Sequence, residues 1–168
     1  MDSVYGAVAP NLEVYLASNF DLVYGVDTNF IKGSVAVCCF IECKVPSLEV
    51  VPEYSLFPFR NCEPGFEERF GWMAVIQKIM GLPGVTDSTR VALVVDHDQA
   101  NHHRYLKREI PVYADFYLPS NFKLVYARGK GKSGINGLVT WCDEFSRGCL
   151  REFVDTGRPG FKGRRFTI

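Results

Sequence analysis

The spacing of apolar positions changes several times along the chain, and each spacing predicts a different element. Apolar runs at residues 20–26 and 34–42 predict two buried strands, and the short polar turn between them predicts an antiparallel hairpin. A third strand is expected within residues 48–59, towards a sheet edge because two prolines interrupt it. Residues 64–80 then carry apolar side chains in two stripes at helical spacing, which predicts a helix buried on two sides.

The second half of the chain alternates strands and helices. Residues 90–95 form a continuous apolar run, which is typical of a central strand covered on both faces. We expect a short helix over residues 99–109, a strand over 122–127 and a long helix from residue 135 or 136 to 153. This order predicts an α/β fold with a mixed five-stranded sheet, in which antiparallel hairpin strands are followed by parallel strands and helices flank the sheet.

Length and composition indicate a single domain. The 168 residues are 47% hydrophobic, which is enough for one buried core and too little chain for two ordinary domains. No repeat or Ser/Pro-rich linker divides the sequence. We therefore expect one domain over residues 1–168, with a core at about 20–153, an N-terminal arm at 1–18 and a basic tail at 154–168.

The sequence also indicates the compartment. No apolar run reaches the roughly 18 residues that a membrane span needs, and the first ten residues lack the features of a signal peptide. We expect an intracellular, cytoplasmic protein that does not bind a membrane. The six cysteines include no CxxC pair, so free, mostly buried thiols are expected in place of disulfides or a zinc site.

Charge is segregated along the chain although the net charge is zero. Residues 1–84 carry 5 basic and 10 acidic side chains, and residues 85–168 carry 14 basic and 9 acidic ones. The basic part would suit a polyanion such as nucleic acid. A solvated basic tail explains the same pattern, so charge alone does not identify the partner.

Two aspartates each follow a predicted central strand. Ligands in open α/β sheets bind beyond the carboxyl ends of such strands, where Asp27 and Asp96 are expected. Two carboxylates that meet there repel each other unless a cation lies between them, and Mg²⁺ prefers hard oxygen ligands. Glu68 and Asp143, from the two flanking helices, could complete a site for two ions of the kind that cleaves phosphodiester bonds.

Each acid also has an ordinary structural explanation. An Asp after a strand often caps a helix or forms a turn, which applies to Asp96. Glu67 and Glu68 favour the positive end of a helix dipole, and Asp143 could lie on a solvated helix face. The placement of all four acids on suitable elements in order favours the metal site.

With these motifs the chain resembles the ribonuclease H-like superfamily, and most closely ribonuclease H type I. The first strand of that family ends in Asp, matched here by GVDTN at Asp27, and its long hairpin is matched by IKGSVAVCCFIE. Its first helix opens with a catalytic Glu, matched by ERFGWMAVIQKI at Glu68. Glu67 remains the alternative, because apolar spacing alone sets this register.

The resemblance continues through the second half of the chain. The fourth strand of the family ends in Asp, matched by VALVVDHDQAN at Asp96, and its last helix is matched by CDEFSR at Asp143. The family loop before that helix usually carries a His, whereas GKGKSG here supplies Lys130 and Lys132. This departure concerns the efficiency of turnover more than the fold.

The resemblance implies a metal-dependent endonuclease that hydrolyses the RNA strand of RNA–DNA hybrids with two Mg²⁺ or Mn²⁺ ions. Asp27, Glu68, Asp96 and Asp143 would be both the catalytic residues and the metal ligands. Polar groups would contact 2′-hydroxyls and basic groups would contact phosphates. The candidates for these nucleic-acid contacts are Asn29, Gln99, Asn101, Lys130, Lys132, Arg164 and Arg165.

Two alternatives stay open. The chain could be a non-catalytic ribonuclease H-like module that binds nucleic acid or protein. The lack of a His in the GKGKSG loop modestly favours this hypothesis. It could also be a related nuclease that acts on another nucleic-acid substrate.

Overall fold

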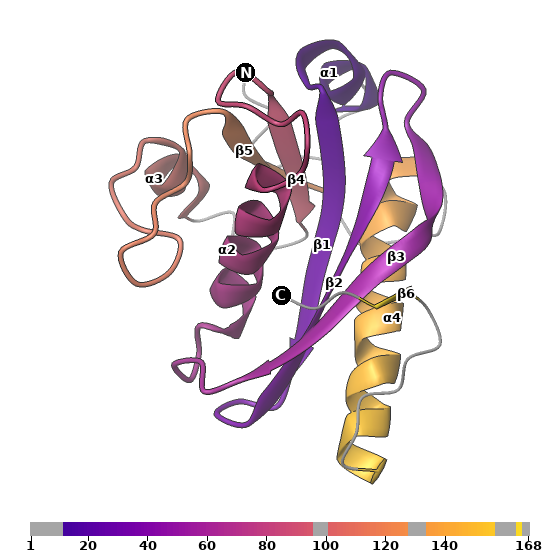
Figure 1. The fold of residues 1–168 in the computed structure, drawn as a ribbon, viewed down its shortest axis with the longest axis vertical. Coiled ribbons are helices and arrows are strands. Elements are labelled where there is room, and N and C mark those ends of the chain that lie inside the picture. Colours follow the sequence, from indigo (N-terminus) through magenta and orange to yellow (C-terminus); the bar gives the residue numbers. More distant parts are fainter. Residues whose placement is uncertain (1–11, 96–100, 128–133, 157–163, 166–168) are drawn as a thin grey trace.

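The computed structural model describes residues 12–95, 101–127, 134–156 and 164–165. Figure 1 shows these residues as one sheet with helices packed against it. None of the described helices is both long and apolar enough to cross a membrane. The elements, in chain order, are α1 (Leu12–Asn19), β1 (Leu22–Phe30), β2 (Val35–Lys44), β3 (Glu49–Arg60), α2 (Glu67–Met80), β4 (Val91–Val95), α3 (His102–Leu106), β5 (Phe122–Tyr126), α4 (Gly134–Thr156) and β6 (Arg164–Arg165).

The sheet has the strand order β5-β4-β1-β2-β3-β6. Strands β1, β2 and β3 form antiparallel pairs, whereas β4 pairs parallel to β1 and β5 pairs parallel to β4. The predicted mixed five-stranded sheet is therefore confirmed. The tail adds a short sixth strand, because β6 pairs parallel with Ser55 and Leu56 of β3.

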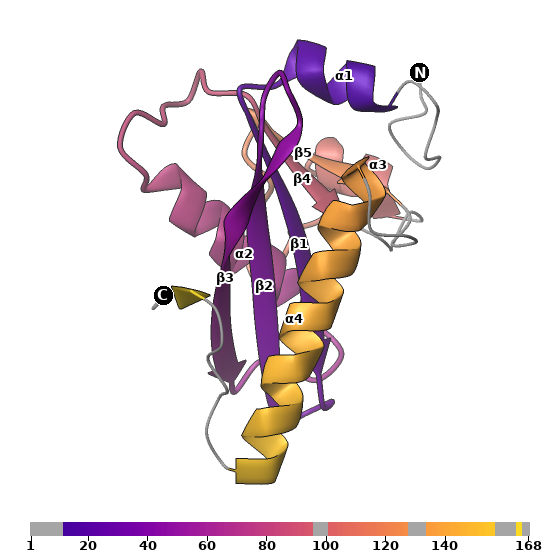
Figure 2. The ribbon, with the colours of Figure 1, turned by 90° about the vertical axis from the view of Figure 1, so that its right-hand side faces the viewer.

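Helices cover both faces of the sheet, which gives the molecule three layers (Figures 1 and 2). One core cluster joins Trp72 and Ile76 of α2 to the sheet and to Tyr105 of α3. The other joins Leu138 of α4 and Leu16 of α1 to the opposite face. Strand β1 therefore lies in the middle layer with helices on both sides, as expected for a strand whose apolar run is continuous.

Strand β1 and helix α1 differ most from the expectation. Strand β1 was predicted to end at Val26, but it continues to Phe30 because its pairing with β2 continues to that residue. Asp27 consequently lies inside the strand. Helix α1 (Leu12–Asn19) includes residues 12–18 of the predicted arm at 1–18, and its Leu12 and Leu16 are buried in the core.

Gly25 of β1 allows helix α4 to pack directly against the strand. A Cβ atom at this position would lie 2.5 Å from Cγ of Leu138, which is fully buried. Real Cβ atoms do not approach other carbon atoms so closely, so a larger residue would force the helix away from the strand. Gly25 thus sets the distance between β1 and α4.

We expect Gly25→Ala to lower the free energy of unfolding by about 1–3 kcal/mol, because the added methyl group overpacks the contact with Leu138. Urea denaturation measures this change. Gly148→Ala is the matched control, since a Cβ at that position of α4 meets nothing within 4 Å. The control should be neutral or stabilising by up to about 1 kcal/mol, because Ala favours helix more than Gly does. Equal stability of the Gly25 variant and the wild type would contradict the packing argument.

Candidate functional site

The end of β1 beyond Gly25 is the part of the sheet where the predicted site residues gather. Among the described residues, β4 pairs with β1 only through Gly25, whereas β2 pairs with it through Phe30. The last residues of β1 therefore have a described strand neighbour on one side only.

Asp27 lies on this part of β1 and is only 6% exposed. Side chains alternate along a strand, so Asp27 and Asn29 point to the same face as Gly25, which contacts Leu138 of α4. Cys39 of β2 is directly opposite Asp27. Burial raises the pKa of the Cys39 thiol, and the negative charge of Asp27 contributes to this shift.

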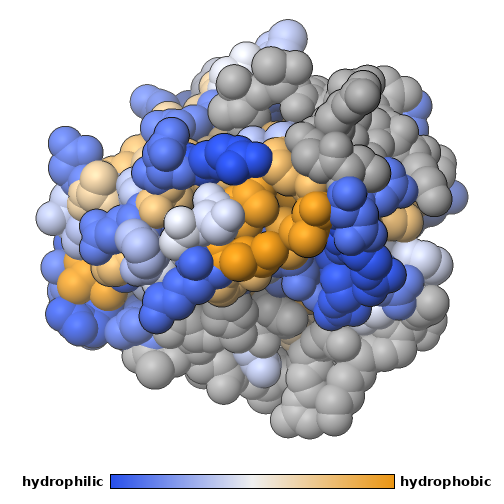
Figure 3. Space-filling view, turned by 90° about the horizontal axis from the view of Figure 1, so that it is seen from below, coloured by the Kyte–Doolittle hydropathy of each residue, from blue (hydrophilic) through white to orange (hydrophobic). Residues whose placement is uncertain are grey.

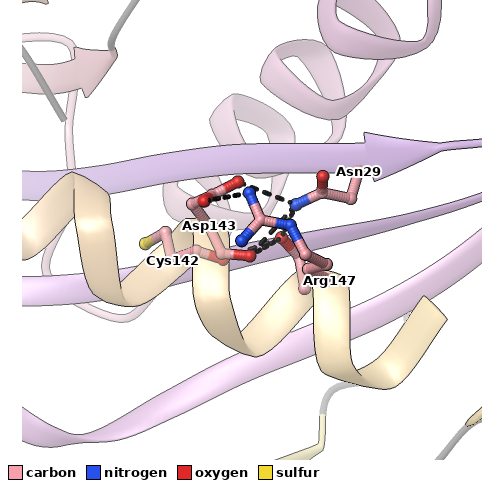
Figure 4. Close-up of polar contacts among 5 residues, drawn as sticks. Asn29, Cys142, Asp143 and Arg147 are labelled. Atoms are coloured by element: carbon pink, nitrogen blue, oxygen red, sulfur yellow. Dashed lines mark hydrogen bonds and ion pairs between the residues drawn. The ribbon is translucent and has the colours of Figure 1, made fainter. Parts of the chain in front are cut away.

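Asn29 links β1 to Asp143 of α4, a residue 114 positions away in the sequence (Figure 4). Its amide nitrogen donates to the Asp143 carboxylate Oδ1 at 3.1 Å and to the Asp143 main-chain oxygen at 3.0 Å. The same nitrogen lies 2.7 Å from the hydroxyl of Ser146, which is fully buried. Asn29 therefore holds the carboxylate of Asp143 against the strand that carries Asp27.

Arg147 binds the other oxygen of the same carboxylate. Its guanidinium Nη2 donates to Oδ2 of Asp143 from one turn further along α4 (Figure 4). The Asp143 side chain is 30% exposed and that of Arg147 is 51% exposed. The carboxylate is thus held between a partly buried strand amide and a solvent-accessible cation.

Glu68 approaches β1 from the opposite face, on helix α2. Gly71, one turn after Glu68, allows this helix to come close, because a Cβ there would lie 2.5 Å from Oγ1 of Thr28 and 3.2 Å from Sγ of Cys38. Burial raises the pKa of the Cys38 thiol well above its usual range, and the charges of Glu68 and Asp27 raise it further. Both carboxylates therefore act on the same buried thiol.

Glu67, the residue before Glu68, accepts hydrogen bonds from the backbone through both of its carboxylate oxygens. It is 3% exposed, its Oε1 accepts a hydrogen bond from the main-chain nitrogen of Gly65 at 3.0 Å, and its Oε2 accepts one from that of Gly33 at 3.1 Å. These bonds connect the β1–β2 turn to the start of α2. Because both oxygens of Glu67 serve the backbone, Glu68 remains the candidate ligand of the two.

The other predicted site residues are placed only in part. Asp96, Gln99, Lys130 and Lys132 lie outside the described residues. Asn101 is the residue that precedes α3, and Arg164 and Arg165 are placed as the backbone of β6.

The described ranges contain no group of three or more His, Cys, Asp or Glu side chains placed to hold a metal ion. Near the end of β1, Asp27 lies on the strand and Asp143 is bonded to Asn29, while Glu68 lies close enough to Cys38 for its charge to raise the pKa of that thiol. Hard oxygen ligands of this type fit Mg²⁺ or Mn²⁺ better than a softer metal.

All six cysteines are free, as predicted, and only Cys62 is not buried.

Apolar surface lies next to this end of the sheet. Phe30 and Ile31, directly after Asn29, are 40% and 44% exposed. Figure 3, which views the lower end of Figure 1, shows apolar surface bordered by hydrophilic side chains.

The sequence matches no protein-family model and no curated protein. Among solved structures, the chain is similar to ribonuclease H1 from the halophilic archaeon Halobacterium salinarum, with a TM-score of 0.50 and 9% identity over 78% of this chain and 98% of that one. The strand order and antiparallel-then-parallel pairing described above agree with this likeness. The chain has the ribonuclease H-like fold.

Two further solved structures are similar to this ribonuclease H-like chain. A foamy viral protease-reverse transcriptase in complex with dsDNA has a TM-score of 0.49 and 13% identity, over 78% of this chain and 97% of that one. The catalytic domain of human endonuclease V has a TM-score of 0.36 and 25% identity, over 47% of this chain and 34% of that one.

Measurements of the free energy of unfolding can distinguish the roles of Glu67 and Glu68. We expect Glu67→Gln to lower the free energy of unfolding by about 1–3 kcal/mol, because the amide replaces one of the two oxygens that accept backbone hydrogen bonds. Glu68→Gln should lower it by less, because Glu68 is only partly buried, whereas Glu67 is 3% exposed with both oxygens bonded to the backbone. Urea denaturation of both variants without divalent cations checks this. Equal losses in the two variants would show that the assignment of roles is wrong.

Proposed function

We propose that this protein is a metal-dependent nuclease that hydrolyses phosphodiester bonds, and that the RNA strand of an RNA–DNA hybrid is its substrate. The observation that carries the proposal is that Asp27 lies near the end of one central strand and that Asn29 of the same strand bonds to Asp143. Asp27 comes from β1, Glu68 from the helix on one face and Asp143 from the helix on the other.

Asp96 is the proposed fourth member. It follows directly after β4, and the parallel register places Val94 of that strand beside Gly25 of β1. Continued for two residues, this register would bring Asp96 beside Asp27. The four carboxylates together would hold two Mg²⁺ or Mn²⁺ ions, which supply an activated water and a charge partner for the leaving 3′ oxygen when they are bound.

The remaining residues of this chain would bind and orient the substrate. Lys130, Lys132, Arg164 and Arg165 are the proposed phosphate contacts, and Gln99 and Asn101 are the proposed contacts to 2′-hydroxyls. Asn29 is not among these proposed substrate contacts, because its amide nitrogen already binds Asp143 and Ser146. We therefore assign to Asn29 the positioning of Asp143.

The test is cleavage of a labelled RNA–DNA hybrid in the presence of Mg²⁺ or Mn²⁺. We expect the wild type to cut the RNA strand and Asp27→Asn to reduce the rate by at least about 100-fold, because it weakens a central ligand for both ions. Asp155→Asn is the matched control, since it makes the same chemical change at an exposed position near the end of α4. Its activity should equal that of the wild type.

Three outcomes separate the alternatives. Cleavage that survives Asp27→Asn would contradict the proposed site. Cleavage of single-stranded or branched substrates in place of the hybrid would indicate a related nuclease with another substrate. Binding of nucleic acid without cleavage of any of these substrates would indicate a non-catalytic module.

A further inference from the structure

Asp143 has a cation of the protein itself beside it. Arg147 donates to Oδ2, and Asn29 donates to Oδ1 from the other side (Figure 4). A carboxylate oxygen whose lone pairs are directed at a guanidinium is a poorer ligand for a second cation. A divalent ion that binds Asp143 therefore has to displace Arg147 or share the carboxylate with it.

We propose that Arg147 is a built-in counter-cation that competes with the divalent metal for Asp143 and thereby sets the affinity of the metal site. This inference rests on the proposed function, which makes Asp143 a metal ligand. Arg147 suits the competition because its side chain is 51% exposed, so water can solvate the guanidinium after its release. A buried arginine would be held far more firmly.

Asn29 keeps Asp143 in place during this exchange. Its amide contacts the main-chain oxygen of Asp143 and the buried hydroxyl of Ser146 in addition to the carboxylate. These contacts do not involve Arg147. Release of the arginine would therefore change the charge at Asp143 without detaching that residue from β1.

The expected effect follows from charge and from competition. Arg147→Gln removes a positive charge next to the proposed ligand and also removes its ion pair, so Mn²⁺ should bind on the order of three- to tenfold more tightly. Arg147→Lys keeps the charge without the planar fork and should lie between the wild type and Arg147→Gln. Arg151→Gln is the matched control, because it makes the same change at an exposed position one turn further along α4. It should change the affinity by less than about twofold.

Binding of Mn²⁺ to the full chain is measured without nucleic acid, by titration calorimetry and by electron paramagnetic resonance of the free ion. The same titrations are repeated with Asp143→Asn and with Asp143→Asn combined with Arg147→Gln. If the competition acts through the carboxylate, the arginine substitution should no longer tighten binding in that background. An equal tightening with and without Asp143 would overturn the inference, because it would reveal only a general effect of charge.

The result also separates this inference from the proposed function. If the wild type binds Mn²⁺ and Asp27→Asn weakens that binding, but Arg147→Gln does not tighten it, the role of Arg147 is wrong and the metal site stands. If neither the wild type nor Arg147→Gln binds Mn²⁺, both proposals fail. Binding by Arg147→Gln alone would support the competition in its strongest form.

Discussion

The close packing of two helices against opposite faces of β1 determines the geometry of the candidate site. Gly25 admits Leu138 of α4 on one face, and Gly71 of α2 lies against Thr28 and Cys38 on the other. Burial of apolar side chains around these contacts stabilises the packing of the two helices on β1. The positions of Glu68 on α2 and Asp143 on α4 follow from that packing. The same packing that stabilises the core therefore places the helices that carry Glu68 and Asp143 on opposite faces of β1.

The elements could be predicted because their signals are local. Continuous apolar runs and helical spacing report burial over a few neighbouring residues, and these patterns located the strands and helices that carry Asp27, Glu68 and Asp143. The end of β1 was missed because it depends on hydrogen bonds to β2, which continue beyond the apolar run. Helix α1 was missed for a related reason, since its two buried leucines are covered by residues far along the chain.

The finer arrangement of the site depends on contacts between distant segments. The bond from Asn29 to Asp143 joins β1 to α4, and no pattern within either segment indicates it. The two backbone bonds of Glu67 likewise require the β1–β2 turn to fold back onto the start of α2. Arg147 is different, because a basic residue four positions after an acid on a helix is a readable signal for an ion pair. That signal was present in the motif CDEFSR.

The distribution of the cysteines has a practical consequence. Cys39, Cys142 and Cys149 are enclosed between the sheet and α4, whereas Cys62 is partly accessible to solvent. A water-soluble alkylating reagent should therefore modify Cys62 at once and reach the enclosed thiols only when α4 separates from the sheet. The rate at which Cys142 and Cys149 are labelled would time the opening of this helix in the native protein, without any introduced probe.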